Sequence, residues 1–291
     1  MPPLRAFFPV EPSEAERRRQ ARPKRRFKMK RMQMPRVSRS AVPSTFTVMN
    51  MVCGYAAIVT ASEGNIIASG WFIIFAALFD TIDGLVARLT NSASNFGVEL
   101  DSLSDLVSFG AAPAFLAYKC GLESLGLVGV LVSACLMVGS GLRLARFNAQ
   151  FSGYKEYFSG LPTPSQAMTV AAFSITVTSE KWLSAEQALW TLVGLSIALS
   201  LLMISKVRYE KLPKPTPEEF RQRPLKFSLF IIASTAVLIF QAKALLVVMT
   251  LYIAGGMLRS LYDFFFEESS TEKSADASAG TANEFSKKQP S

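Results

Sequence analysis

Long apolar runs recur along most of the chain, separated by short polar connections. Eight runs can be identified, at residues 45–62, 66–86, 98–118, 125–144, 165–177, 188–205, 226–240 and 244–266. A helix needs about 20 apolar residues to cross a bilayer, and most of the runs approach that length. The fifth and seventh runs are shorter, so six or seven spans are the alternative. The pattern predicts an all-α integral membrane protein with eight transmembrane helices.

Polar segments divide the predicted spans into groups. Residues 206–225 contain four prolines and break the apolar pattern more thoroughly than any other connection. They separate a six-span catalytic core at 42–205 from two additional helices at 226–267. A basic tail at 1–41 precedes the core. Residues 268–291 consist largely of Ser, Thr, Ala, Gly and Lys, a composition that predicts a disordered tail.

Charge is distributed unevenly along the chain. Residues 1–40 hold thirteen Arg or Lys against three Glu, so this segment alone carries a charge of +10. The whole chain carries +9, because the remaining residues are close to neutral. A polybasic run just before a membrane span favours contact with the anionic cytoplasmic leaflet over contact with nucleic acid. Lys and Arg also concentrate in the connections after the second, fourth and sixth runs. The positive-inside rule therefore predicts cytoplasmic termini, and we expect a bacterial inner membrane protein.

Composition excludes several kinds of chemistry. The chain is 50% hydrophobic and has no histidine, which removes Ser-His-Asp and Cys-His catalysis as well as histidine metal ligands. Its three cysteines, Cys53, Cys120 and Cys135, show neither paired nor metal-type spacing. Any reaction must rely on carboxylates, arginines, lysines and hydroxyls.

Four aspartates interrupt the second and third apolar runs. Asp80 and Asp83 are three residues apart, and Asp101 and Asp105 are four apart, so each predicted helix has one acidic face near its cytoplasmic end. An unpaired carboxylate within a span costs several kcal/mol. Clustered carboxylates repel one another unless cations hold them, and oxygen ligands suit magnesium, calcium or manganese. The sequence predicts a divalent metal site with an active site on the cytoplasmic side.

Small and basic residues accompany the acids. Gly84, Ala87 and Gly97 leave room on the acidic faces for a helix or a ligand, and Arg88 offers a planar cation suited to phosphate. Two other interpretations use the same acids: a set of buried acids paired with basic groups, or a cation-coupled transport site. The negative charges of four acids are not balanced by one nearby arginine, which argues against the interpretation as buried acids paired with basic groups.

The acidic motif resembles a known family. Asp80-Thr-Ile-Asp83-Gly84-Leu-Val-Ala87-Arg88, eight residues, then Gly97-Val-Glu-Leu-Asp101-Ser-Leu-Ser-Asp105 is similar to the complete signature of the CDP-alcohol phosphotransferases, D-x2-D-G-x2-A-R-x8-G-x3-D-x3-D. The resemblance implies a six-helix membrane core, two divalent ions, Mg or Mn, and displacement of CMP from a CDP-linked lipid by an alcohol.

The same resemblance implies roles for individual residues. Metal would be held by Asp80, Asp83, Asp101 and Asp105, and Asp105 would also be the catalytic base. The CDP part would be bound by Gly84, Ala87, Arg88 and Gly97. Where the family often has Pro-Asn, this chain has Pro43-Ser44, so Thr45 or Asn50 would supply a nucleotide contact instead.

Further motifs bear on the acceptor alcohol. Residues 141–148 and 158–164, with 43–54, resemble the branch of the family that makes phosphatidylserine, over most of the core and not beyond it. This implies CDP-diacylglycerol and L-serine as substrates. Arg143 and Arg146 share a helix face and could hold the serine carboxylate or a lipid phosphate, with Asn148 nearby, but ordinary topogenic charge explains the two arginines equally well.

Other expectations complete the prediction. The alternative acceptors are glycerol 3-phosphate and an inositol phosphate, and the alternative class of protein is an ion-coupled transporter. Membrane lipids are expected partners, nucleic acid is not, and we expect a homodimer.

Overall fold

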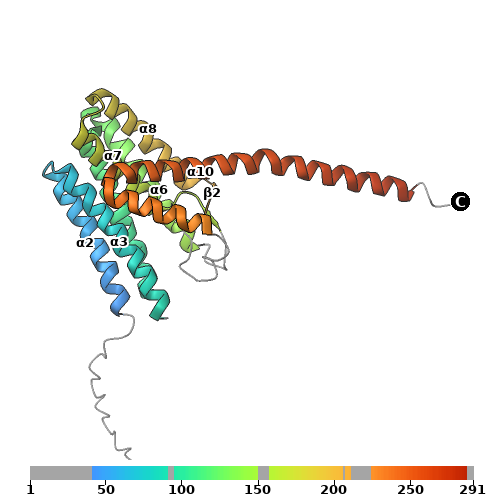
Figure 1. Ribbon diagram of the computed structural model, residues 1–291, viewed down its shortest axis with the longest axis horizontal. Coiled ribbons are helices and arrows are strands. Elements are labelled where there is room, and N and C mark those ends of the chain that lie inside the picture. The colour runs from blue at the N-terminus through green and yellow to red at the C-terminus, as the bar shows by residue number, and fades with distance from the viewer. Residues whose placement is uncertain (1–40, 91–94, 150–156, 206, 211–223, 287–291) are drawn as a thin grey trace, which may run out of the picture. The chain divides into compact units, whose positions relative to one another are not determined.

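The computed structural model describes residues 41–90, 95–149, 157–205, 207–210 and 224–286. Five of its α-helices follow the predicted apolar runs closely (Figure 1): α2 (Ala41–Ser62), α3 (Ile66–Thr90), α6 (Leu127–Ala149), α7 (Thr163–Glu180) and α8 (Ala185–Ile204). The predicted basic tail and most of the loop predicted at 206–225 lie outside the described residues.

The third predicted run forms three helical segments that follow one another without a break. They are α4 (Asn95–Asp105), a π-helical turn η1 (Leu106–Ala111) and α5 (Ala112–Cys120). A short 3₁₀ segment η2 (Leu122–Leu125) then leads into α6. Together, α4, η1 and α5 cover the stretch that the sequence assigns to one span.

Five helices in the described part of the chain are long and apolar enough to cross a membrane. They lie in α2, α3, α6 and α8 and in a stretch of α10 from Ile231 to Tyr262. Helix α7 has only 18 residues and carries Thr, Ser and Gln on buried positions, because it is surrounded by protein. The structure confirms a multi-pass helical membrane protein, while the count of eight spans stays a prediction.

Helix α10 (Pro224–Ser286) consists of two arms joined at Gln241, whose φ of 50° and ψ of −128° are not helical. The first arm, 224–240, and the start of the second arm, which begins at 242, correspond to the last two predicted runs. The second arm continues to Ser286, which differs from the disorder predicted for 268–291. Its alanines, glutamates and lysines are favourable helix residues, and the chain has no proline there before Pro290.

A short pair of strands was missed by the sequence. β1 (Tyr157–Ser159) pairs antiparallel with β2 (Arg208–Glu210), with Phe158 opposite Tyr209. Three residues are too few to show a strand period, so no sequence pattern indicates them. They connect the segment before α7 to the segment after α8, and they are the one departure from an all-α fold in the described residues.

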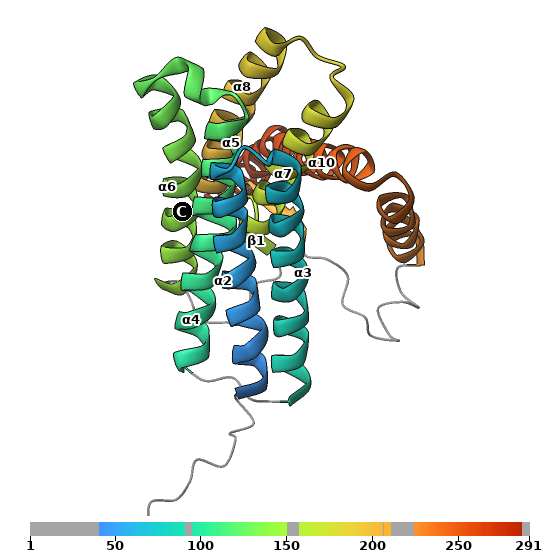
Figure 2. The ribbon, with the colours of Figure 1, turned by 90° about the vertical axis from the view of Figure 1, so that its left-hand side faces the viewer.

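Small residues let the helices pack closely. One buried cluster contains alanines from α2, α3, α5 and α7: Ala57, Ala61, Ala76, Ala77, Ala112, Ala167 and Ala171. Figure 2 shows α2 beside α3 and α4. Gly54 of α2 lies directly against Ser108 of η1, where a Cβ would come within 2.7 Å of the Ser108 Cα. Membrane helices associate through such close contacts because lipid supplies little hydrophobic drive.

We predict that Gly54→Ala lowers the thermal stability of the detergent-solubilised protein, because the added methyl forces α2 away from η1, at a cost of about 1–3 kcal/mol. Gly194→Ala is the matched control, since a Cβ at Gly194 meets nothing within 4 Å. Thermal aggregation midpoints measure both. Equal midpoints for Gly54→Ala and the wild type would show that the contact is not tight.

Candidate metal centre

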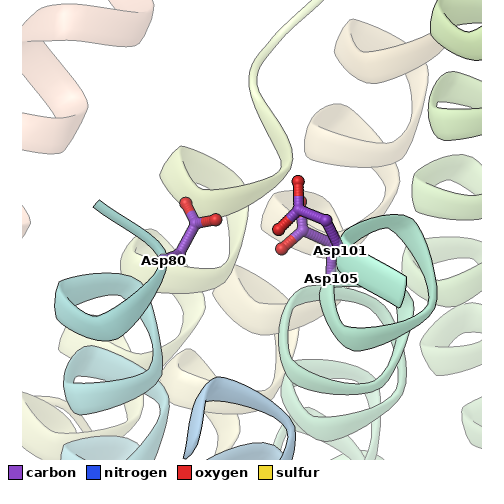
Figure 3. A group of neighbouring side chains, drawn as sticks. All are labelled: Asp80, Asp101 and Asp105. Atoms are coloured by element: carbon purple, nitrogen blue, oxygen red, sulfur yellow. The ribbon is translucent and has the colours of Figure 1, made fainter. Parts of the chain in front are cut away.

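Two helices bring three carboxylates together. Asp80 lies on α3, while Asp101 and Asp105 lie one turn apart on α4. One oxygen of each lies within 4.8 Å of the others, and all three side chains are half-buried. Figure 3 shows Asp80 facing the other two across the space between the helices. The predicted convergence of the two acidic faces is therefore correct for these three residues.

Asp83 lies beside this group but turns toward α2. Its side chain is only 6% exposed, and it accepts a hydrogen bond from the Thr47 hydroxyl. Its Oδ1 atom is buried and has no hydrogen-bond partner among the described residues. The carboxylate is close enough to Asp80 and Asp101 to interact with both electrostatically. A direct role of Asp83 as a metal ligand stays a prediction.

Helix α2 holds the acidic helix α4 in register. The Ser104 hydroxyl donates to the Thr47 carbonyl at 2.9 Å, and the Ser108 hydroxyl donates to the Asn50 carbonyl at 2.8 Å. These two bonds advance in the same direction along both helices, so α2 and the α4–η1 segment run parallel. The Asn50 amide donates to Asp105 Oδ1 at 3.3 Å. Asn50 was predicted to contact the nucleotide. In the structure its amide forms a hydrogen bond with Asp105, the predicted general base.

Thr47 is the site residue that the sequence prediction missed. Its hydroxyl reaches Asp83 and its carbonyl accepts from Ser104. A signal was present in the spacing: Thr47, Asn50 and Gly54 recur at i, i+3 and i+7 and mark one polar, small-residue face of α2. That face is the one turned toward α4 and η1.

The π-helical turn η1 begins immediately after Asp105. Single π turns are rare and often occur at functional sites. Ser108, Phe109 and Gly110 of this turn are buried. The irregular turn therefore lies in the protein interior, between the acidic helix and α5, and no pattern in the sequence indicates it.

The end of α6 lies alongside the acidic group. Asn148 Nδ2 donates to Ser102 Oγ of α4 at 2.9 Å. Arg143 is 8% exposed, and its positive charge is near enough to Asp105 for the two groups to attract one another. Arg146, three residues on, is half-buried and interacts with Arg143. Of the three α6 residues predicted near the acceptor, Asn148 therefore contacts α4 directly, and the other two lie within the two turns that precede it.

The residues predicted to bind the CDP group lie on α2, α3 and α4. Gly84 and Ala87 follow Asp83 on α3 and are partly exposed, and Gly97 is partly exposed near the start of α4. Thr45 is exposed at the beginning of α2. The side chain of Arg88 lies outside the described part of the chain. Their contacts with a CDP group stay predictions.

The site fits a divalent cation. Three carboxylate oxygens lie within 4.8 Å of one another, and a fourth carboxylate next to them has a buried oxygen without a hydrogen-bond partner among the described residues. Close carboxylates in a partly buried setting repel one another unless positive charge is supplied. A set of hard oxygen donors selects magnesium, manganese or calcium over softer metals.

These features define a multi-pass membrane protein with an acidic site able to bind divalent cations between its helices. The family model for CDP-alcohol phosphatidyltransferase matches residues 40–198. This match covers more than half of the chain and includes α2, α3, α4 and α6. The chain belongs to the CDP-alcohol phosphatidyltransferase family.

Several curated proteins are similar to it. A CDP-diacylglycerol–serine O-phosphatidyltransferase of Helicobacter pylori is 32% identical over 221 residues, 76% of this chain and 91% of that protein. The CDP-diacylglycerol–serine O-phosphatidyltransferase of Bacillus subtilis is 33% identical over 177 residues, 61% of this chain and 94% of that protein. An archaetidylserine synthase of Methanothermobacter thermautotrophicus is 35% identical over 173 residues, 59% of this chain and 70% of that protein.

The first of these matches corrects one expectation. The sequence indicates a resemblance confined to residues 42–205, which is 164 residues. The match to the Helicobacter protein spans 221 residues and so extends beyond the core. Similarity to this relative therefore includes part of the segments that the sequence treated as additions.

We predict that Asp101→Asn weakens Mn²⁺ binding to the purified protein at least about tenfold, since it removes one charged oxygen ligand from the acidic group. Glu99→Gln is the matched control. It removes the same charge from the same helix, but from an exposed side chain outside the group. Electron paramagnetic resonance titration of free Mn²⁺ measures both, and equal affinities for the two variants would argue against a metal site here.

Proposed function

We propose that this protein transfers the phosphatidyl group from CDP-diacylglycerol to L-serine, giving phosphatidylserine and CMP. The observation that most directly supports this proposal is the cluster of three carboxylates, Asp80, Asp101 and Asp105, in a chain of this family. The relatives support serine as the acceptor. The Helicobacter and Bacillus proteins are CDP-diacylglycerol–serine O-phosphatidyltransferases, and the Methanothermobacter protein is an archaetidylserine synthase.

Asp105 is the proposed base. The serine hydroxyl attacks the phosphorus that carries the diacylglycerol, the bond from that phosphorus to the CMP oxygen breaks, and the hydroxyl proton passes to the Asp105 carboxylate. The hydrogen bond from the Asn50 amide to Oδ1 orients this carboxylate, leaving the other oxygen to face the acceptor. A positioned general base contributes about 100-fold to 10,000-fold to such a reaction.

Asp80, Asp83, Asp101 and Asp105 would hold two divalent ions, Mg²⁺ or Mn²⁺. Bound metal would neutralise the pyrophosphate and stabilise charge during the in-line displacement. The acidic residues keep their arrangement through α2: Thr47 holds Asp83, and the Ser104 bond to the Thr47 carbonyl holds the turn between Asp101 and Asp105. The CDP group would contact Gly84, Ala87, Arg88 and Gly97.

Arg143 is the proposed anchor for the serine carboxylate. It is nearly buried and interacts with Asp105, so a carboxylate bound to it would bring the serine hydroxyl toward the base. An arginine binds a carboxylate through two parallel N–H donors, which also orients the acceptor. Arg146 adds a second positive charge nearby. A glycerol 3-phosphate or inositol phosphate acceptor would need cations for a second phosphate, and remains the alternative.

The proposed membrane orientation has the acidic site and both termini in the cytoplasm of a bacterial cell. It rests on the positive charge at the connections and on the Asn148–Ser102 bond, which puts the α6 C-terminus beside the acidic helix. A homodimer is the proposed assembly.

The decisive experiment measures CMP release by the purified protein from CDP-diacylglycerol and a panel of alcohols: L-serine, glycerol 3-phosphate, inositol phosphate and water alone. Each is tested with Mg²⁺, with Mn²⁺ and with a chelator. Metal-dependent release with serine alone supports the proposal. Release with glycerol 3-phosphate and not with serine would overturn the choice of acceptor while leaving the family assignment intact.

We predict that Asp105→Asn lowers kcat about 100-fold to 10,000-fold, because an amide cannot take the hydroxyl proton. One oxygen ligand is retained, so binding of CDP-diacylglycerol with metal should persist in a fluorescence titration. Asp101→Asn should instead weaken that binding itself. Near-normal turnover in Asp105→Asn would rule out its role as the base.

Membrane orientation is tested by thiol labelling in a background without Cys53, Cys120 and Cys135. We predict that Ala149→Cys, at the exposed end of α6, reacts with an impermeant reagent only from the cytoplasmic side. Trp182→Cys, exposed between α7 and α8, should react only from the opposite side. Reaction of both from the same side would contradict the proposed topology.

A further inference from the structure

The π-helical turn η1, which follows the acidic helix α4, packs against α6. A Cβ at Gly110 of this turn would come within 3.3 Å of the Ser140 Cβ and 3.8 Å of the Met137 Cα. Leu106, at the start of the turn, reaches Gly141, where a Cβ would come within 3.6 Å of the Leu106 Cδ1 atom. Helix α6 therefore lies directly against the turn around Ser140.

Ser140 donates a hydrogen bond to the backbone of this turn. Its side chain is fully buried, and its hydroxyl oxygen lies 3.2 Å from the Phe109 carbonyl oxygen. In a regular α-helix, that carbonyl would accept from the amide four residues later in the chain. The residue there is Pro113, which has no N–H to donate. The Ser140 hydroxyl therefore supplies a donor that the helix itself lacks at this position.

Two other acceptors lie near the same hydroxyl, at longer distances. Gln166 Oε1 of α7 is 3.4 Å from the Ser140 oxygen, and Met203 Sδ of α8 is 3.5 Å from it. A hydroxyl has one hydrogen to donate, and a thioether sulfur is a weak acceptor. The Phe109 carbonyl, as the nearest of the three, is therefore the preferred partner of Ser140.

A second hydrogen bond fixes the register of α6 on the acidic helix. Asn148 Nδ2 donates to Ser102 Oγ at 2.9 Å. The later residue of α6 thus bonds to the earlier residue of α4, so α6 runs antiparallel to the α4–η1 segment. Asp105 lies three residues after Ser102 and four before Phe109. The two bonds from α6 therefore bracket the turn of helix that carries the Asp105 carboxylate.

Helix α2 holds the neighbouring residue of the same π turn. The Ser108 hydroxyl donates to the Asn50 carbonyl at 2.8 Å, and Gly54 lies against Ser108. Ser108 and Phe109, which are adjacent in η1, are thus bonded to different helices. The turn cannot rewind without breaking one of these bonds, and Asp105 is the residue that immediately precedes it.

We propose that Ser140 is a positioning residue of the active site, which acts on Asp105 through the π turn. Its bond to the Phe109 carbonyl keeps η1 in the π form, and this sets the direction in which the Asp105 carboxylate points toward Asp80 and Asp101. This inference rests on the proposed roles of the aspartates as metal ligands and of Asp105 as the base. It extends the site to α6, whereas the aspartates lie on α3 and α4.

The first test is a titration with Mn²⁺ followed by electron paramagnetic resonance, which needs no substrate. Ser140→Ala removes the hydroxyl. We expect the Mn²⁺ affinity of the purified protein to fall about 3- to 10-fold, the size of one neutral hydrogen bond that holds the acids in place. A role confined to stability would lower the thermal midpoint and leave the affinity of the folded protein unchanged.

Ser133→Ala is the matched control for this titration. Ser133 lies seven residues earlier on α6 and is also buried, but its hydroxyl donates to the Val130 carbonyl of its own helix at 3.0 Å. The same chemical change there removes no contact with η1. Its Mn²⁺ affinity should therefore match that of the wild type.

Turnover gives a second measurement on the same variants. CMP release is followed at saturating Mn²⁺, where weaker metal binding no longer limits the rate. A displaced base is not restored by more metal, so kcat of Ser140→Ala should stay at least about fivefold below the wild type. The KM for CDP-diacylglycerol should change by less than about threefold.

Gln166→Met tests which acceptor of the Ser140 hydroxyl matters. This change removes the amide and keeps a side chain of similar length, so Ser140 can still donate to the Phe109 carbonyl. We expect wild-type Mn²⁺ affinity. A loss equal to that of Ser140→Ala would assign the effect to the contact with Gln166 and would overturn an action through the π turn.

A pair of glycine variants tests the contact without changing Ser140. Gly110→Ala crowds η1 against α6 and should weaken Mn²⁺ binding in the same way as Ser140→Ala. Gly141→Ala should not, because its Cβ would make an ordinary 3.6 Å contact with Leu106. Should Ser140→Ala fail to fold, as judged by monodispersity and thermal midpoint, this pair decides the question.

The outcomes separate the positioning role from the proposed function. Wild-type Mn²⁺ affinity and kcat in folded Ser140→Ala overturn the positioning role, and so does an equal loss in Ser133→Ala. If the wild-type protein uses an acceptor other than serine, the proposed function fails, but the Mn²⁺ comparison involves no acceptor. A selective loss of affinity in Ser140→Ala would then still support the placement of Asp105 by α6.

Discussion

Mutual repulsion among carboxylates in an apolar setting is the constraint on which the rest of this structure depends. Asp80, Asp101 and Asp105 bring three negative charges within 4.8 Å, at the ends of helices that otherwise suit lipid. A divalent cation held by these oxygens would relieve the repulsion. Helices α3 and α4 gather the acids, and the end of α6 lies beside α4.

Hydrogen bonds and small residues hold the acidic helices where hydrophobic burial cannot. In a bilayer, the driving force for helix association comes from close packing and polar contacts. Here Ser104 and Ser108 donate to two backbone carbonyls of α2 that lie three residues apart, and Gly54 lets the π turn approach. The same contacts that join the helices therefore set the height and rotation of Asp105, so that packing and the geometry of the site are one arrangement.

Much of the fold and the core of the site could be predicted from patterns that act locally. Apolar runs indicated the helices, and spacings of three and four placed the aspartates on two helix faces. Other features depend on contacts between distant segments. The strands at Tyr157 and Arg208 are too short for any period, and the turn of Asp83 toward Thr47 depends on how α2 and α3 are rotated.

The sequence by itself determined that the chain is a helical membrane protein and that four aspartates form two acidic faces, because hydropathy and helical periodicity are properties of single segments. Only the tertiary structure decided which carboxylates meet, which α2 side chain bonds to Asp83, and that the arm after Gln241 packs against α7. These outcomes depend on side-chain contacts across helix interfaces. Turning a helix about its axis by the angle of one residue changes every contact partner, and no local sequence pattern encodes that angle.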